Sequence, residues 1–354
     1  MISMTQWSAM EFSGSVPDVT ISIGATRVRV TVTVGDKTVY SETLYPIGGD
    51  VRLSNLYEVL NPVMESRLVD TVTLEATEER VTTSSNGAMS SEEVSTSSMS
   101  CRMVYLNGRS MADCGEWCEK NYLSLLQGTQ TSAEGRLEYL HYIGTEAAVA
   151  LATYTDGTSR SFTPPSVGGG VLYRTIDVSP SQFKTEGKEL SMVVVTAGAR
   201  TRQYLIDRTQ PDCAPTLLFT NCFGCQELLY CTGTHQVAPE YKRSSAYIGG
   251  LMTDYDIEET RTFKADTGVL TQDMARWADD LFRSKDIRIV NFNGGKPVIG
   301  PRIVVTDSKS ENSNTPDTLP RFTFSYRYAT EQQNYIDMGR AGKIFDNTFD
   351  YTFN

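Results

Sequence analysis

The sequence predicts a mainly β protein of several β-sandwich domains, with one amphipathic helix in the last domain. Apolar and polar residues alternate near the amino terminus, which is the pattern of strands with one buried face. The apolar members of these two runs are Val19, Ile21 and Ile23, then Val28, Val30, Val32 and Val34. The 18 Tyr favour strands, and 27 Gly with 13 Pro suit a chain of short elements and turns. With 354 residues and 40% hydrophobic content, the chain can build two or three cores.

Residues 1–108 are expected to form the first β-sandwich. A turn at 35–37 leads into a hairpin partner at 38–44, a short helix or turn lies in 53–63, and another strand covers 67–76. Residues 82–100 are nearly all Ser, Thr, Asn, Gly and Glu, which predicts a long Ser-rich loop before the next strand. That loop is either simply flexible or a contact loop that becomes ordered against a partner.

Residues 109–210 are expected to form a middle β-domain. A short amphipathic segment lies in 111–127. The predicted strands follow at 137–143, 147–153, 171–178, 189–196 and 202–206, with the last two joined as a hairpin through Ala197-Gly198-Ala199. The prolines at 211 and 215 mark a domain boundary.

Residues 211–354 are expected to form a β-rich third domain with a helix at 271–283. Thr271 can cap the helix, and Asp273 lies in the first turn, where the helix dipole favours an acid. The apolar residues have the spacing of one buried stripe: Met274, Trp277, Ala278, Leu281 and Phe282. Strands are predicted at 301–306 and 321–328, with a polar loop at 307–317 between them.

Few residues suggest catalysis. The chain has only two histidines; His141 lies within a predicted strand as a structural side chain, and His235 lies in a predicted loop. Cys222 or Cys231 could in principle work with His235 as a nucleophile, but no local signature of such a site surrounds them. We therefore expect no catalytic residues and no enzyme.

The cysteines allow a metal site without requiring one. Cys222 and Cys225 have the two-residue gap of a zinc knuckle, Cys231 follows, and Cys114 and Cys118 could add ligands. The usual second pair with a two-residue gap is missing. The favoured interpretation is buried or half-buried free thiols with no cofactor, since seven Cys is an odd number.

The charge and the apolar runs restrict the partners. A net charge of -11 argues against a nucleic-acid-binding surface, which needs clustered Lys and Arg. No apolar run approaches the length that crosses a bilayer, and the start of the chain lacks the pattern of a signal peptide. These features predict a soluble protein made in a cytoplasm.

The carboxyl end carries an unusual aromatic tandem. Phe345, Phe349 and Phe353 recur every four residues, and Tyr351 lies among them. Exposed aromatic side chains at the end of an acidic chain would promote non-specific association, so we expect this tail to pack against a protein surface. It docks either on its own domain or on a neighbouring subunit, and in the second case these four residues form a subunit interface.

Three segments together resemble a known class of proteins. They are residues 217–227 with 230–233 behind them, 306–310 leading to 322–327, and 344–354. This pattern resembles tail-associated structural proteins of tailed phages and prophages of gut Bacteroidetes-type bacteria, most densely from residue 210 onward. The resemblance brings no catalytic residues. At Cys222 and Cys225 the family carries Ser and an apolar residue, which weighs against zinc.

The resemblance implies a structural virion protein of the phage tail, such as a distal-tail, baseplate hub or tail-tip ring component. Its partners would be identical subunits in a ring and other tail proteins. An alternative is a carbohydrate-binding adsorption module of a tail spike or fibre. A further alternative is a tail-borne polysaccharide or cell-wall hydrolase, which needs a pair of carboxylates in a cleft.

Overall fold

The computed structural model describes the whole chain except residues 1, 171, 209–214, 294–295, 310–318 and 331–354. Strands account for 55% of the chain and helices for 12%, so the predicted mainly β, multi-domain sandwich is confirmed. The chain divides into two compact units, residues 1–207 with 220–227, and residues 208–219 with 228–354. The expected boundary between residues 108 and 109 falls inside the first unit and stays a prediction.

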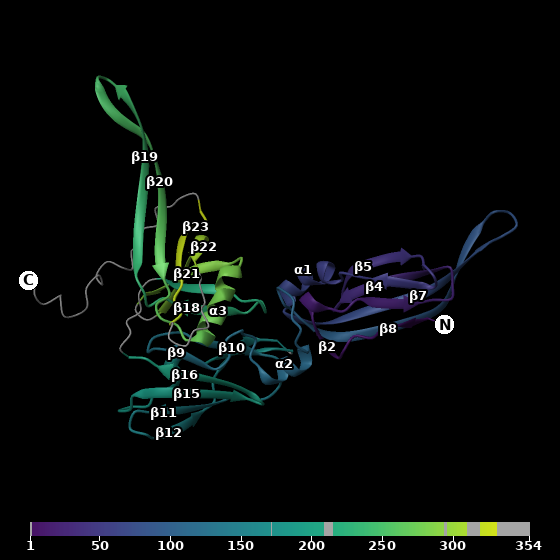
Figure 1. Cartoon of the computed structure of the whole chain (residues 1–354), viewed down its shortest axis with the longest axis horizontal. Helices are drawn as coiled ribbons and strands as arrows, with labels where there is room; N and C mark the ends of the chain where they lie inside the picture. Colours follow the sequence, from purple (N-terminus) through teal and green to yellow (C-terminus); the bar gives the residue numbers. More distant parts are fainter. Residues whose placement is uncertain (1, 171, 209–214, 294–295, 310–318, 331–354) are drawn as a thin grey trace, which may run out of the picture. The chain divides into compact units, whose positions relative to one another are not determined.

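The amino-terminal part of the first unit packs two sheets and a helix around one core (Figure 1). Its elements are β1 (Ser3–Met4), β2 (Met10–Phe12), β3 (Val19–Ser22), β4 (Arg27–Val34), β5 (Lys37–Leu44), β6 (Asp50–Leu53), α1 (Tyr57–Arg67), β7 (Val69–Thr83) and β8 (Met89–Val104), with a 3-10 turn at Ser13–Ser15. The sheets have the orders β1-β3-β6 and β2-β8-β7-β4-β5. All four valines of β4 are fully buried, as their alternation predicts.

The predicted loop at 82–100 is wrong over most of its length. Residues 89–100 belong to β8, which pairs with β7 in continuous antiparallel register as far as Thr83↔Met89. Only residues 84–88 form the turn. The polar composition of this segment suggested a loop, because the outer parts of both strands are exposed on both faces and therefore lack the alternation of apolar and polar residues.

The second part of the first unit contains a five-stranded and a three-stranded sheet, ordered β12-β11-β15-β16-β9 and β10-β14-β13. Its elements are α2 (Cys114–Lys120), β9 (Thr129–Ser132), β10 (Tyr139–Tyr142), β11 (Val149–Tyr154), β12 (Ser159–Phe162), β13 (Ser166–Gly169), β14 (Arg174–Asp177), β15 (Leu190–Ala197) and β16 (Arg200–Ile206), with a 3-10 turn at Pro180–Phe183. The predicted hairpin through Gly198 is confirmed.

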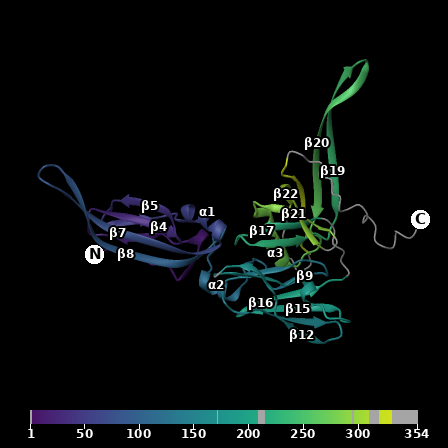
Figure 2. The ribbon, with the colours of Figure 1, turned by 180° about the vertical axis from the view of Figure 1, so that it is seen from behind.

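The second unit is built on one seven-stranded sheet, ordered β18-β17-β21-β22-β23-β20-β19 (Figure 2). Its elements are β17 (Thr216–Thr220), β18 (Gln226–Tyr230), β19 (His235–Ile248), β20 (Leu251–Asp266), α3 (Gln272–Arg283), β21 (Ile287–Asn293), β22 (Lys296–Lys309) and β23 (Thr323–Tyr328). The predicted helix is confirmed: the Thr271 hydroxyl accepts from the Met274 amide at 3.2 Å, and Trp277 and Leu281 are buried. The loop expected from 307 begins later, because β22 continues to Lys309.

Candidate assembly surface

The residues 217–227 that carry the resemblance form a rigid turn in which Asn221 is the central side chain. Its carboxamide oxygen accepts from the backbone amides of Phe223 and Cys225, at 3.0 and 2.9 Å. Its amide nitrogen donates to the Leu123 carbonyl at 2.9 Å. Gly224 has φ +77°, and a Cβ there would lie 2.4 Å from Leu68. The spacing of the two cysteines in this segment therefore follows from a backbone turn.

Four of the five candidate metal-binding cysteines meet in one apolar cluster of the first unit. Cys114, Cys118 and Cys225 are buried there, with Cys222 packed against them, while Cys231 belongs to the second unit. Phe223 stacks on Trp117 in the same cluster, with ring centroids 4.7 Å apart. Within the described ranges, no group of three or more His, Cys, Asp or Glu side chains is placed to hold a metal ion. Burial also raises the pKa of the Cys225 thiol, which disfavours the thiolate.

The two histidines have structural partners. His141 is buried in β10, where Nδ1 lies 2.9 Å from the Thr175 hydroxyl and Nε2 lies 3.0 Å from the Gln226 carbonyl oxygen. Burial lowers the pKa of His141, so its ring is neutral near pH 7. His235 was expected in a loop, but it begins β19, and its Nε2 lies 2.9 Å from the Tyr326 hydroxyl.

A buried carboxyl group in the first unit, that of Glu138, has a pKa well above its ordinary value. Glu138 accepts hydrogen bonds from Gln130 at 2.9 Å and Ser132 at 2.8 Å, which ties residues 130–132 of β9 to the segment before β10. Desolvation raises the pKa of Glu138 to about 7, although Arg136 and Arg202 oppose the shift. The side chain is buried in the protein interior, so we assign Glu138 a structural role.

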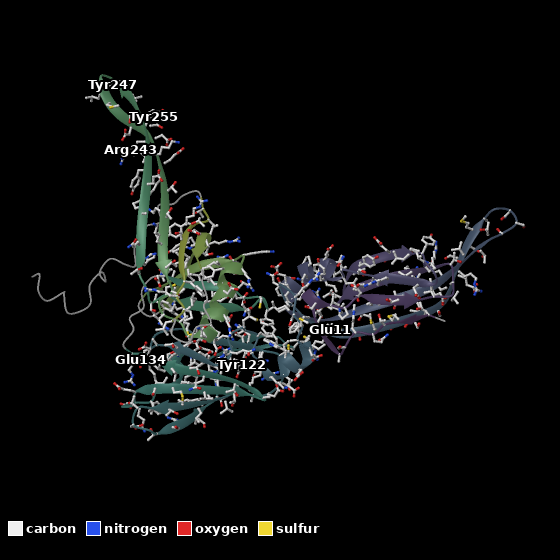
Figure 3. The ribbon with its side chains drawn as sticks, viewed as in Figure 1. Glu11, Tyr122, Glu134, Arg243, Tyr247 and Tyr255 are labelled. Atoms are coloured by element: carbon white, nitrogen blue, oxygen red, sulfur yellow. The ribbon has the colours of Figure 1, made fainter. Side chains whose placement is uncertain are left out.

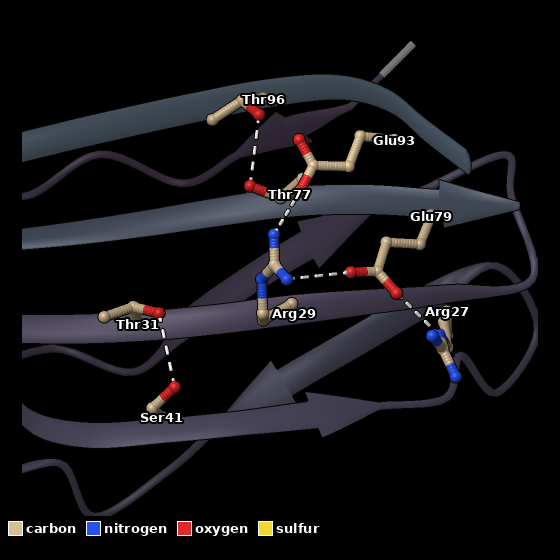
Figure 4. A network of polar contacts seen from close by, with 8 residues as sticks. All are labelled: Arg27, Arg29, Thr31, Ser41, Thr77, Glu79, Glu93 and Thr96. Atoms are coloured by element: carbon tan, nitrogen blue, oxygen red, sulfur yellow. Dashed lines mark hydrogen bonds and ion pairs between the residues drawn. The ribbon is translucent and has the colours of Figure 1, made fainter. Parts of the chain in front are cut away.

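A second polar network lies on the exposed face of the amino-terminal sheet (Figure 4). Glu79 is almost fully buried between two arginines, with Arg27 Nε at 2.7 Å and Arg29 Nη1 at 3.3 Å from its carboxylate oxygens. Arg29 also binds Glu93 on β8. These pairs link β4, β7 and β8 across the sheet where the β7–β8 hairpin leaves it. They fix the base of that hairpin.

The most exposed regular element is the hairpin of β19 and β20, which extends well beyond the sheet of the second unit (Figure 1). Fourteen residues of β19 are paired with β20 through the turn at Gly249-Gly250, where φ is +61° and +83°. Positive φ at both central residues is the geometry of the tight hairpin turn that glycine favours. Sequence reasoning missed this hairpin, although a Gly-Gly pair between two strand-like runs is a recognisable signal.

The root of this hairpin is firmly packed. Phe263 stacks on Tyr326 of β23 with centroids 4.8 Å apart, and His235 stacks on both rings. Strand β23 pairs with β20 from Phe263 to Asp266. A shallow groove of about 350 Å³ borders this root, lined by Gln236, Lys264 and Asp307 among other polar residues. The hairpin therefore extends from a rigid base.

Beyond its root, the hairpin has two chemically different faces. Alternation along β19 and the register with β20 place five exposed apolar side chains on one side, which we call the apolar face: Val237, Tyr241, Tyr247, Met252 and Ile257. Arg243 lies on this face too, with its guanidinium 5.7 Å from the Tyr241 ring centroid. The opposite face carries Ala and polar residues only, until Ile248 and Leu251 flank the turn.

Figure 3 shows the side chains of Arg243, Tyr247 and Tyr255 along the outer part of this hairpin. Tyr247 is 77% exposed and Met252, opposite it, is 67% exposed. A register shift between Ser244 and Ser245 leaves Tyr255 as the extra residue of a β-bulge, and it is 67% exposed. The same face also carries charged residues, because Glu259 lies opposite Tyr241 and Asp254 lies between Ile257 and Met252. Exposed aromatic and aliphatic side chains gathered in this way on a polar ribbon are typical of an interaction site.

The predicted interface residues Phe345, Phe349, Tyr351 and Phe353 lie outside the described residues. In the described part of the chain, no helix is both long and apolar enough to cross a bilayer.

Comparisons with known proteins identify no family. No family model matches the chain, and no curated protein matches it. Among solved structures, a three-domain immunoglobulin fragment of titin with an E-to-A mutation is 9% identical, covers 75% of this chain and 92% of its own, and has a TM-score of 0.19. A titin tandem covers 93% and 90% at 7% identity and a TM-score of 0.16. At these TM-scores the likeness carries no argument.

Proposed function

We propose that this protein is a structural subunit of a phage tail, in a distal-tail, baseplate hub or tail-tip ring, and that it acts by self-assembly rather than by catalysis. The observation that carries this proposal is the amphipathic hairpin of β19 and β20, whose apolar face has no described partner within the chain. The phage tail, and a location in the virion, come from the resemblance of residues 217–227 and 306–327 to phage tail proteins.

The energetics of the hairpin support assembly. An isolated two-stranded ribbon is at best marginally stable in water, so a partner is needed to hold its outer part. A ribbon ten residues long and two strands wide has a face of roughly 300 Å² at about 3.3 Å per residue. About half of that face is apolar, so burying it at about 25 cal/mol per Å² of apolar surface contributes roughly 4 kcal/mol per subunit before the costs of ordering. This is enough to drive association when it is repeated by symmetry.

The first test is the oligomeric state of the full chain. Native mass spectrometry and light scattering at micromolar concentration are expected to show a closed oligomer. Ile257→Ser together with Tyr241→Ser should raise the concentration needed for assembly at least tenfold. Ile47→Ser is the matched control, since Ile47 is a 90% exposed isoleucine of the first unit and does not belong to the hairpin. A wild-type chain that stays monomeric at 100 µM overturns the proposal.

The second test concerns the tail and the virion. Removing residues 344–354 should weaken the oligomer while the protomer keeps its unfolding transition, if the aromatic tail contributes to the interface. Mass spectrometry of purified particles of the phage that encodes the chain should detect the protein, and antibody labelling should place it at the tail. Its absence from particles contradicts the virion assignment.

A second candidate function is glycan binding by an adsorption module. It is favoured by the three exposed tyrosines of the hairpin, Tyr241, Tyr247 and Tyr255, because aromatic rings can stack on sugars. A glycan array probed with the full chain tests it. Binding that is lost in Tyr247→Ala but kept in Tyr57→Ala would support adsorption, and a blank array removes it.

A further inference from the structure

Beyond its root, the β19–β20 hairpin has two long edges that pair with no other described strand. Strand β19 is the last strand of the seven-stranded sheet and pairs with β20 alone among the described strands. Strand β20 pairs with β23 only over Phe263–Asp266, so no described strand lies beside its segment 251–260. Open edges present unpaired backbone donors and acceptors, which is a template for another strand.

The two strands of the hairpin carry opposite charge at the same distance from its root. Strand β19 has Lys242 and Arg243, while β20 has four acids at Asp254, Asp256, Glu258 and Glu259. Within one hairpin, Lys242 Nζ lies 3.2 Å from Glu258 and Arg243 Nε lies 3.6 Å from Asp254. With Glu240 included, the segment 240–248 of β19 has two cations and one acid, whereas 251–260 of β20 has four acids and no cation. A second acidic strand on the outer side of β19 would therefore find a net attraction. Pairing β20 with another β20 would bring eight carboxylates together.

We propose that β19 of one copy pairs edge to edge with β20 of a second copy of this chain. This pairing rests on the proposed self-assembly and specifies its partner and its polarity. The two strands of a hairpin run in opposite directions, so rotating copies about an axis along the strands places each β20 antiparallel to the next β19. Such a heterologous contact repeats around a ring, and a closed ring leaves no open edge.

The geometry of the hairpin limits the register of this contact. Pro239 in β19 has no amide hydrogen and therefore cannot donate to a neighbouring strand. The segment 240–248 of β19 and the segment 251–260 of β20 are nearly equal in length and share the same height above the sheet. Pairing over these segments would place the apolar faces of all copies on one side of the closed sheet. That arrangement explains why one face is apolar and the other polar.

A charge-swapped chain tests the pairing. The variant Lys242→Glu, Arg243→Glu, Asp254→Lys, Glu258→Lys reverses both ion pairs, so opposite charges still face each other within its own hairpin and between like copies. It should therefore assemble alone. When it is coexpressed with differently tagged wild type, its β19 meets a like-charged β20, so mixed oligomers should fall at least tenfold below random mixing in native mass spectra. In 1 M salt the discrimination should decrease.

The control swaps a matched exposed pair in the first unit, Asp18→Arg with Arg52→Asp, where the two residues lie 2.8 Å apart. It should mix freely with wild type. If the hairpin variant mixes randomly with wild type, the edge pairing is wrong, but the proposed self-assembly is unaffected. If variant and wild-type chains form separate oligomers only when residues 344–354 are present, those residues and not a second hairpin pair with the edge. A monomeric wild type would overturn the proposed function itself.

A milder variant keeps the inference testable if the fourfold variant does not fold. Lys242→Gln with Arg243→Gln removes the attraction without adding repulsion. It should raise the concentration at half assembly at least threefold and flatten its dependence on salt. An unchanged concentration with an unchanged salt dependence overturns the pairing.

Discussion

Replacing Glu138 by Gln tests whether the first unit contains a carboxyl group that is neutral when the protein is folded. The group is buried and its pKa lies at about 7, against an ordinary value of 4.5 in the unfolded chain. A raised carboxyl pKa means that the folded state holds its proton more tightly. Glu138 therefore contributes stability that is fully present below pH 4.5 and is lost as the pH rises through 7.

The magnitude follows from these two pKa values. Each unit of pKa difference corresponds to about 1.4 kcal/mol, so the whole displacement is worth about 3 kcal/mol. Between pH 5.5 and pH 8, linkage gives a loss of about 2 kcal/mol in the free energy of unfolding from this group alone. Other carboxylates also titrate, so the informative quantity is the difference between wild type and Glu138→Gln at each pH.

Urea unfolding of the full chain, followed by tryptophan fluorescence at several pH values between 5.5 and 8, measures this difference. The Gln variant keeps an uncharged side chain of the same shape between Gln130 and Ser132, so it should gain about 2 kcal/mol relative to wild type across the range. A flat difference, or a wild type that gains on the variant as the pH rises, refutes the reasoning. It would mean that Arg136 and Arg202 hold the carboxylate charged.

Three further substitutions or treatments have defined outcomes. Asn221→Ala removes the acceptor of the Phe223 and Cys225 amides and should lower the unfolding free energy by about 2 to 4 kcal/mol in urea melts, whereas the exposed-turn control Asn86→Ala should change it by under 0.5 kcal/mol. Leu281→Ala leaves a cavity at a fully buried position of α3 and should lower the unfolding free energy by about 2 to 5 kcal/mol in the same assay. Leu319→Ala, at an exposed leucine, should leave the unfolding free energy unchanged. Burial raises the pKa of the Cys101 thiol to about 12, so iodoacetamide at pH 8 should alkylate Cys101 only after urea is added, as peptide mass spectrometry can check. Alkylation of the native chain within minutes would contradict that burial.

The sequence was most informative where a segment has one buried and one exposed face. The valines of β4 and the stripe of α3 predict their elements well, because burial on one side enforces a period of two or of 3.6. Residues 80–83 of β7 and 89–98 of β8 have no buried face, so their polar residues resemble a loop, and only the register of the hairpin reveals them as strands.

The candidate site was harder to predict for the same reason. Tyr241 and Ile257 alternate with charged residues, as in a strand of a sandwich, yet no described element forms a second layer on them. Their sequence pattern therefore does not distinguish an exposed ribbon from a sandwich strand. The joining of Cys114 and Cys118 with Cys225 in one apolar cluster depends on contacts across about a hundred residues. Spacing along the chain cannot reveal such contacts.

The bare ribbon of β19 and β20 has a cost for any copy that waits alone. Its exposed apolar side chains and unpaired strand edges would attract misplaced neighbours, chaperones and proteases, and the exposed turn at Gly249-Gly250 is a site where a protease could cut. The cell would then have to synthesise this chain no faster than the assembly incorporates it, because unincorporated copies would precipitate or be degraded.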